Sequence, residues 1–229
     1  MLKKFISTVI FLSALTSFGA ANWMQEFYAD VPPVKIKKPL GVMVGSLNPE
    51  NPVITISIQD VGLYTGHICP CIAAGFKATV LALESLYGKE TPVRGKIRIA
   101  TNEPSELLDV ASYITGARAF YGREEVNHND IVIDKTLGEK PGIVIMVFQR
   151  KDTGKMIKVT FNKTKLFNPK EMKKMKQLKD KVLKGKATKR EEIMMREILQ
   201  EKVKQILFNL PDGAITVETI KDYKFPQKD

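Results

Sequence analysis

Isoleucines alternate with other residues over residues 53–58, and an alternation with a period of two predicts a strand with one buried face. Residues 62–66 begin and end with glycine, so we expect a loop there. Pro70 suits the first turn of a helix, and residues 72–86 are apolar on nearly every side. This pattern predicts a buried central helix in which Gly75 lets another element approach closely.

The next apolar segments are shorter and predict strands and one further helix. Residues 96–101 and 130–134 each predict a strand, whereas residues 105–114 predict a helix with a serine N-cap and a glycine stop. Residues 142–148 and 156–161 flank a turn sequence and predict a β-hairpin. The resulting order of helix, strand, helix and three strands predicts an α/β fold.

A lysine-rich segment over residues 166–209 predicts a helical hairpin. Asn168 and Thr188 are each followed three residues later by glutamate, the pattern of a capping box, and Gly185 separates the two helices. Each helix carries an apolar stripe: Met172, Met175, Leu178 and Val182 in the first, and Met195, Leu199, Val203 and Ile206 in the second. Residues 170–204 hold 13 basic and 6 acidic residues, a net charge of +7. We interpret the segment as a solvated amphipathic hairpin packed on the core, with a docking arm for a partner or an acidic surface as the alternative.

The first residues have the pattern of a secretory signal peptide. Lys3 and Lys4 precede an apolar run over residues 5–18 that is too short to span a bilayer, and small residues before position 22 suit cleavage after Ala21. We therefore expect a secreted or periplasmic protein that does not span a membrane after cleavage, with an uncleaved N-terminal anchor as the alternative. Removal of the two lysines lowers the formal net charge from +11 to +9.

These segments predict four parts of the chain. We expect a signal peptide over residues 1–21, an α/β domain over 22–165, the basic helical hairpin over 166–209, and a C-terminal tail over 210–229 that packs on the main domain. A mature chain of this length can bury a core without disulfides, so fold stability explains its cysteines poorly.

The only two cysteines, Cys69 and Cys71, lie two and four residues after His67, which is one of two histidines. Thiolates and imidazole suit zinc and copper, and a helix N-terminus at Pro70 favours the thiolate form. We therefore predict a transition-metal site at His67, Cys69 and Cys71, with zinc as the expected ion and copper as the alternative. Further ligands would come from Glu106, Asp109, His128 or water.

Two other interpretations of the cysteine pair stay open. A Cys-x-Cys pair can close a strained and therefore labile disulfide, which would suit a periplasmic thiol–disulfide redox protein. Alternatively, Cys69 and Cys71 are inert buried residues beside a satisfied histidine. The sequence contains no phosphate-binding loop, dinucleotide-binding loop or serine-hydrolase elbow. The basic hairpin has few aromatic residues to stack on bases, so we expect no nucleic-acid partner.

The segment Gly66-His67-Ile68-Cys69-Pro70, followed by Gly75, resembles the opening motif of the FmdE family of formylmethanofuran dehydrogenase proteins. The resemblance continues at Asp109, at Ile114-Thr115-Gly116 and in the turn over residues 152–155. It implies a mixed sheet packed on helices in the order deduced above, metal binding through histidine and cysteine, and a homodimer. Residues 22–165 would then form a domain of this family, in a divergent exported member.

The chain departs from the family pattern at three places. Cys71 replaces a glycine, Glu106 replaces a cysteine, and the lysine-rich hairpin lies near the position of a zinc ribbon found in many members. Only His67 and Cys69 match the family's ligand positions directly, and a carboxylate with a new cysteine would replace the lost thiolate. An exported protein cannot easily join a cytoplasmic formylmethanofuran dehydrogenase, so we do not expect that enzyme role.

The predicted function is therefore an exported metal-binding accessory or carrier module that uses a His/Cys site at a helix N-terminus. The alternative is a periplasmic thiol–disulfide redox protein that uses the Cys-Pro-Cys pair. We expect a homodimer, and a protein partner that docks through the basic hairpin. The residues leave open whether the protein is an enzyme.

Overall fold

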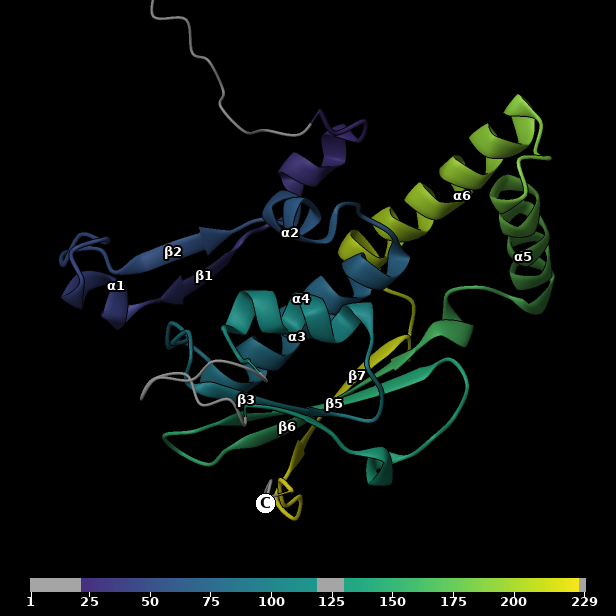
Figure 1. Ribbon diagram of the computed structural model, residues 1–229. Helices are drawn as coiled ribbons and strands as arrows, with labels where there is room; N and C mark the ends of the chain where they lie inside the picture. Colours follow the sequence, from purple (N-terminus) through teal and green to yellow (C-terminus); the bar gives the residue numbers. More distant parts are fainter. Residues whose placement is uncertain (1–21, 119–129, 227–229) are drawn as a thin grey trace, which may run out of the picture.

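The computed structural model describes residues 22–118 and 130–226 of the chain (Figure 1), so the predicted signal peptide lies outside the described residues. The helices are α1 (Pro39–Met43), α2 (Ile58–Thr65), α3 (Pro70–Tyr87), α4 (Glu106–Thr115), α5 (Pro169–Leu183) and α6 (Lys189–Phe208). The strands are β1 (Val34–Lys37), β2 (Val53–Ile56), β3 (Ile97–Thr101), β4 (Ile131–Ile133), β5 (Ile143–Arg150), β6 (Met156–Asn162) and β7 (Ile215–Ile220). Short 3₁₀ turns lie at Glu26–Asp30, Lys135–Leu137 and Lys163–Lys165. The α/β class is confirmed, as is the order of helix, strand, helix and three strands from α3 to β6.

One five-stranded mixed sheet has the strand order β4, β3, β5, β6, β7. β3 and β4 are parallel, and the other neighbouring strands are antiparallel. The register places Ile99 opposite Phe148 and Phe148 opposite Ile157, so these buried side chains share one face of the sheet. Figure 1 shows α3 and α4 on one face of the sheet, which agrees with the mixed sheet packed on helices that the resemblance implied.

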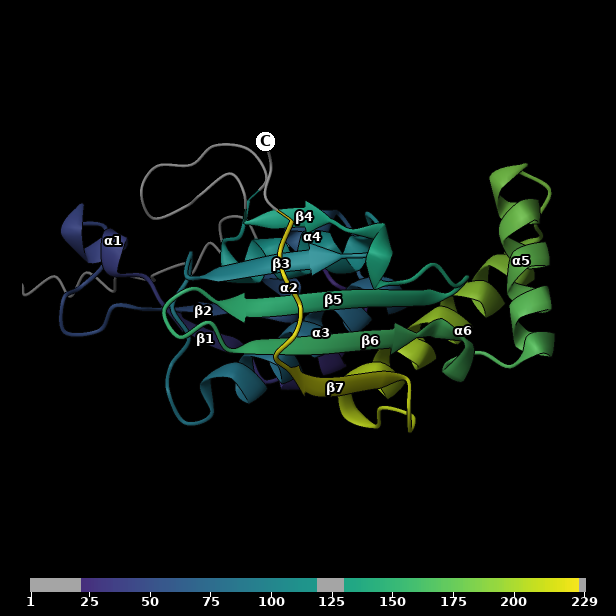
Figure 2. The same ribbon diagram turned by 90° about the horizontal axis from the view of Figure 1, so that it is seen from below.

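The opposite face of the sheet is crossed by the segment that follows β7, as Figure 2 shows. Tyr223 and Phe225 pack there on a small apolar cluster of Ala100, Val132, Val147 and Met156. The Tyr223 hydroxyl donates a hydrogen bond of 2.8 Å to Asp134, just after β4. The Arg98 guanidinium lies 4.5 Å from the centre of the Phe225 ring. These contacts fasten the segment after β7 across the sheet.

The central helix α3 lies unusually close to α4. A Cβ atom added at Gly75 would lie 3.0 Å from the Cα atom of Leu107 and 3.0 Å from the Cβ atom of Val110, both in α4. Carbon atoms normally pack about 3.5–4.0 Å apart, so only glycine allows this approach without a shift. The close approach predicted at Gly75 is confirmed, and it brings the start of α4 toward the start of α3.

The predicted loop over residues 62–66 is wrong, because most of this segment belongs to α2. A capping box starts α2: the Ser57 side chain accepts a hydrogen bond from the Asp60 N–H, and the Asp60 carboxylate accepts one from the Ser57 N–H. The cap ends the preceding strand at Ile56, two residues earlier than predicted. Gly66 takes a left-handed conformation, with φ of 78°, and ends the helix.

The lysine-rich segment forms the two predicted helices, each started by a capping box. The side chains of Asn168 and Thr188 accept hydrogen bonds from the backbone N–H groups of Glu171 and Glu191. Gly185, with φ of 64°, lies between the helices as predicted. None of the helices over residues 22–118 and 130–226 has both the length and the apolar character needed to cross a bilayer.

The two helices of the hairpin pack differently. α6 packs on α3 and buries Val203 and Ile206, whereas α5 mainly contacts α6 and stands at the edge of the molecule (Figure 1). Of the apolar stripe of α5, only Leu178 is buried. The hairpin is therefore packed on the core through α6, and most of the α5 stripe stays accessible.

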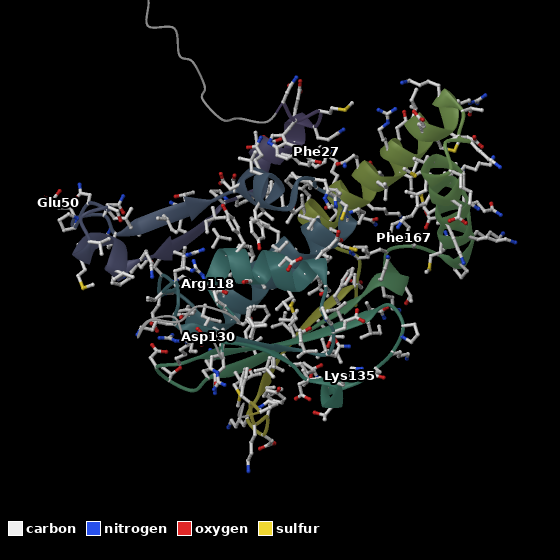
Figure 3. The ribbon with its side chains drawn as sticks, in the orientation of Figure 1. Phe27, Glu50, Arg118, Asp130, Lys135 and Phe167 are labelled. Atoms are coloured by element: carbon white, nitrogen blue, oxygen red, sulfur yellow. The ribbon has the colours of Figure 1, made fainter. Side chains whose placement is uncertain are left out.

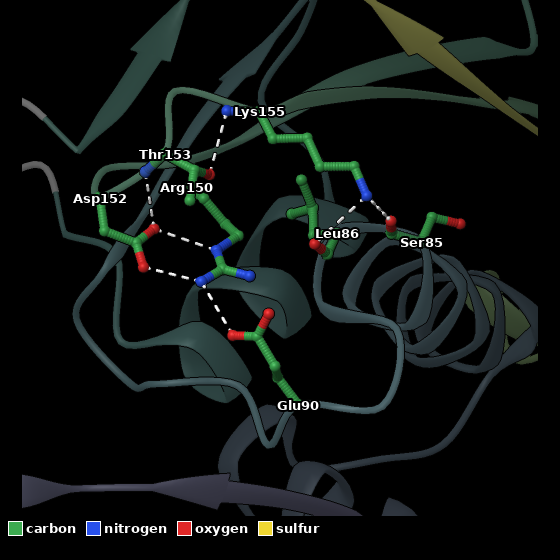
Figure 4. A network of polar contacts seen from close by, with 7 residues as sticks. All are labelled: Ser85, Leu86, Glu90, Arg150, Asp152, Thr153 and Lys155. Carbon is green, nitrogen blue, oxygen red and sulfur yellow. Dashed lines mark hydrogen bonds and ion pairs between the residues drawn. The ribbon is translucent and has the colours of Figure 1, made fainter.

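A polar network ties the β5–β6 turn to the end of α3 (Figure 4). The Arg150 guanidinium donates two hydrogen bonds to Asp152, at 2.7 and 3.0 Å, and one of 3.1 Å to Glu90. It also lies 4.0 Å from the centre of the Tyr87 ring, at the last residue of α3. Lys155 donates to the carbonyls of Ser85 and Leu86, which are free acceptors at a helix end. The turn sequence over residues 152–155 thus holds α3 in place.

Candidate metal centre

The site lies where the first residues of α3 and α4 meet. His67 is in the short link between α2 and α3, Cys69 is the N-cap of α3, and Cys71 lies in its first turn. Glu106 is the first residue of α4, so the Gly75 contact between the two helices brings it to the cysteines. Both helix N-termini carry partial positive charge, which favours thiolates and carboxylates there.

Glu106 lies close to two of the three predicted metal ligands, His67 and Cys69. Its Oε1 atom lies 3.5 Å from His67 Nε2, and its Oε2 atom accepts a hydrogen bond of 3.5 Å from the Cys69 thiol. One ligand atom from each of the three residues can be chosen so that all lie within 4.8 Å of one another. The His67 and Glu106 side chains are 53% and 45% exposed, so an ion can enter from solvent.

The His67 ring is oriented by its own backbone. Its Nδ1 atom lies 3.2 Å from the Thr65 carbonyl oxygen, which can only accept, so Nδ1 carries the hydrogen. In the neutral ring, Nε2 then presents a lone pair toward the Glu106 carboxylate. Two acceptors that face each other at this distance need a cation between them, either a proton or a metal ion.

The pKa values of the site show how its groups interact. Burial lowers the pKa of His67, but contacts with Cys69, the Thr65 carbonyl and Glu106 outweigh burial, so the pKa is raised above its ordinary value. A hydrogen bond between the thiols raises the pKa of Cys69, and burial raises it further. The same hydrogen bond lowers the pKa of Cys71 despite burial, and the charge of Lys163 adds to this effect. Of the two thiols, Cys71 therefore gives up its proton before Cys69 does.

The loop that carries His67 and Cys69 is held by α6. Gln200 donates a hydrogen bond of 3.0 Å to the Ile68 carbonyl, between the two ligands. The Tyr28 hydroxyl donates one of 2.6 Å to the Gln200 side-chain oxygen and fixes the amide. The sequence did not reveal this link, because Gln200 and Ile68 are 132 residues apart.

The structure brings His67, Cys69 and Glu106 together, and Cys71 lines the same groove beside them. Both cysteines are free thiols. Asp109 lies exposed one turn further along α4 and is not in the cluster formed by the described residues. His128 lies outside the described residues.

The donor set fits a transition-metal ion. Around a tetrahedral ion with metal–ligand bonds of about 2.0–2.3 Å, neighbouring ligand atoms lie roughly 3.3–3.8 Å apart. The two distances of 3.5 Å are in this range but involve different oxygens of Glu106, and a set of one atom from each residue spans up to 4.8 Å, so the side chains would close slightly on a bound ion. His67, Cys69 and Glu106 would hold the ion, with Cys71 as the nearest further donor, and the ion would supply Lewis acidity or bind a ligand there.

A groove of about 870 Å³ runs from this cluster along the hairpin. Its walls come from the apolar stripes of α5 and α6, and Phe167, labelled in Figure 3, lies where the chain leads into α5. From the sequence we expected these stripes to pack on the core, and the groove was not predicted.

An α/β domain with converging imidazole, thiol and carboxylate groups belongs to the class of domains equipped to hold a transition-metal ion. The family model described as "FmdE, Molybdenum formylmethanofuran dehydrogenase operon" matches residues 64–216, which is well over half of the chain. The chain belongs to this family. The matched region starts just before His67 and ends within β7, so it includes the site, the sheet and the hairpin. No curated protein matches the chain.

Proposed function

We propose that this protein is an exported metal-binding accessory or carrier module that holds a transition-metal ion between α3 and α4. The observation that carries the proposal is the convergence of His67, Cys69 and Glu106 within 4.8 Å. Cys71 is the proposed fourth donor, and zinc is the proposed ion, with copper as the alternative. Membership of the family supports a metal site at this motif.

The proposed location is the periplasm or the outside of the cell. It rests on the charged, apolar and small residues in positions 1–21, which have the order of a cleavable signal. Two neighbouring thiols in an oxidising compartment become a disulfide unless a metal or a redox partner protects them. Export and metal binding therefore support each other. A homodimer, and a partner that docks on the basic hairpin, are parts of the same proposal.

Elemental analysis of the purified full chain tests the metal site. We expect near-stoichiometric zinc or copper, and we expect Cys69→Ser to remove it because the variant loses a thiolate at the centre of the cluster. Circular dichroism of the variant checks that the fold is kept. Metal-free wild-type protein with both thiols free to react would refute the proposal.

A thiol–disulfide redox protein is the second candidate. The observation in its favour is the pair of neighbouring free thiols, Cys69 and Cys71, whose interaction lowers the pKa of Cys71 and raises that of Cys69. Such a pair provides one thiolate for attack on a disulfide. A thiol count on the protein as isolated, before and after reduction, separates the candidates. An unchanged count excludes a Cys69–Cys71 disulfide in that preparation.

A further inference from the structure

The groove beside the metal centre has the size and lining of a small-molecule site. Its volume of about 870 Å³ falls in the range of ligand pockets, roughly 300–1,000 Å³. Six apolar side chains of the hairpin helices line it, namely Met172, Met175, Val182, Leu183, Met195 and Leu199. The polar cluster of His67, Cys69 and Glu106 lies in the same groove, as expected for a site that orients a ligand.

Part of this apolar lining is open to solvent. The relative exposure of Met172 is 43% and that of Leu183 is 73%, although both belong to the apolar side of α5. Exposed apolar surface of this kind, rimmed by charged groups, marks a binding surface in soluble proteins. Helix α5 therefore presents apolar side chains that the described part of the chain does not cover.

The charges around the groove are almost all positive. Lys163, Lys173, Lys176 and Lys179 line it, and among the lining residues that the structure describes the only acidic one is Glu106, which belongs to the metal cluster. Lys163 lies at the cluster end, since its charge acts on the Cys71 thiol. An apolar wall with a cationic rim complements a molecule that has an apolar body and a negative charge.

We propose that the groove binds an amphipathic organic anion of the alkyl carboxylate class. Its apolar body lies along the methionine and leucine side chains of α5 and α6, and its carboxylate lies between Lys163 and the ion held by His67, Cys69 and Glu106. The contact with the ion rests on the proposed metal site, whereas the contacts with the lysines and the apolar walls do not.

A second copy of this chain fits the same surface less well. The hairpin carries a net charge of +7 over residues 170–204, so two hairpins that cover each other's grooves would bring like charges together. A negatively charged ligand gains from the same lysines. Charge complementarity therefore favours the organic anion.

Isothermal titration calorimetry on the full chain tests the inference with decanoate and decyltrimethylammonium, which share an alkyl chain and carry opposite charges. We expect decanoate to bind and the cation not to bind. The variant Lys163→Gln should weaken decanoate binding by about threefold, the effect expected of one exposed ion pair. The matched control is Lys165→Gln, which removes the same charge from the same 3₁₀ turn at a position that does not line the groove.

The outcomes separate this inference from the proposed function. Metal-loaded protein that binds neither probe, or binds both equally, would overturn the inference and leave the metal site intact. Decanoate binding that depends on Lys163 in a protein without metal would support the groove and overturn the metal site. A monomer–dimer equilibrium that Met172→Lys abolishes, without decanoate binding, would assign the groove to a second copy and overturn the inference.

Discussion

Replacing Glu106 by glutamine tests whether its carboxylate is a metal ligand or only a neighbour of the cysteines. The substitution keeps the shape of the side chain and removes its charge. Glu106 lies 3.5 Å from both His67 Nε2 and Cys69 Sγ, so a ligand role predicts weaker metal binding. A neighbour role predicts the opposite, because the Glu106 charge raises the pKa of both thiols and its loss makes the thiolates easier to form.

The size of the expected loss follows from the position of Glu106 in the cluster. Removing a group that only supports a ligand costs about 10–100-fold in metal affinity. A carboxylate that contacts the ion itself should cost at least the upper end of that range, about 100-fold or roughly 2.7 kcal/mol. The easier ionisation of the thiols opposes this loss only in part, since the pKa of Cys69 is raised mainly by its hydrogen bond to Cys71 and by burial.

Competition with a chromophoric chelator measures the affinity at fixed pH, with Asp109→Asn as the matched control. Asp109 is an exposed carboxylate on the next turn of α4 and lies outside the cluster, so its amide variant should bind metal as the wild type does. Unchanged or tighter binding by Glu106→Gln would refute its role as a ligand. An equal loss in both variants would show a general effect of helix charge.

Two further substitutions test contacts away from the ligands. Gln200→Leu removes the hydrogen bond to the Ile68 carbonyl and should lower metal affinity by about tenfold with an unchanged circular dichroism spectrum; an unchanged affinity would exclude a positioning role. Tyr223→Phe removes a hydrogen bond to Asp134, whose pKa is lowered because hydrogen bonds outweigh its burial. A carboxyl group whose pKa is lowered by folding stabilises the fold at a pH above its pKa in the unfolded chain, which is about 3.9. This stabilisation is lost as the pH falls through the lowered pKa. Urea unfolding of the variant should therefore show a loss of about 1–2 kcal/mol at neutral pH that shrinks in acid, and a loss independent of pH would contradict this origin.

The elements that the sequence predicted correctly are those with local signals at both ends. α3 starts at Pro70 and contains the apolar run, and the hairpin helices start at capping boxes that can be recognised in the printed sequence. α2 was missed although its capping box, Ser57 with Asp60, is also local, because the alternation of the preceding strand continues into Ile58. β1 was not predicted, because its strand conformation depends on pairing with β2.

The candidate site was predictable only as far as its ligands are close in sequence. His67 and Cys69 stand out because rare residue types gather within a few positions. Glu106 was only one of several further candidates, because it joins them through the packing of α4 on α3 at Gly75, which a single sequence does not show. The groove was hidden for a similar reason: an apolar stripe has the same period whether another element covers it or leaves it open.

The charges at the site favour one of the two proposed metal ions over the other. Thiolates at Cys69 and Cys71, with the Glu106 carboxylate and a neutral His67, would place three negative charges around one ion. The shared thiol proton must leave when both sulfurs bind, so metal uptake should release protons. A divalent ion would leave one negative charge, which the ammonium group of Lys163 can balance at the cluster end of the groove. A monovalent copper ion would leave one more charge uncompensated, and this difference favours zinc as the proposed ion.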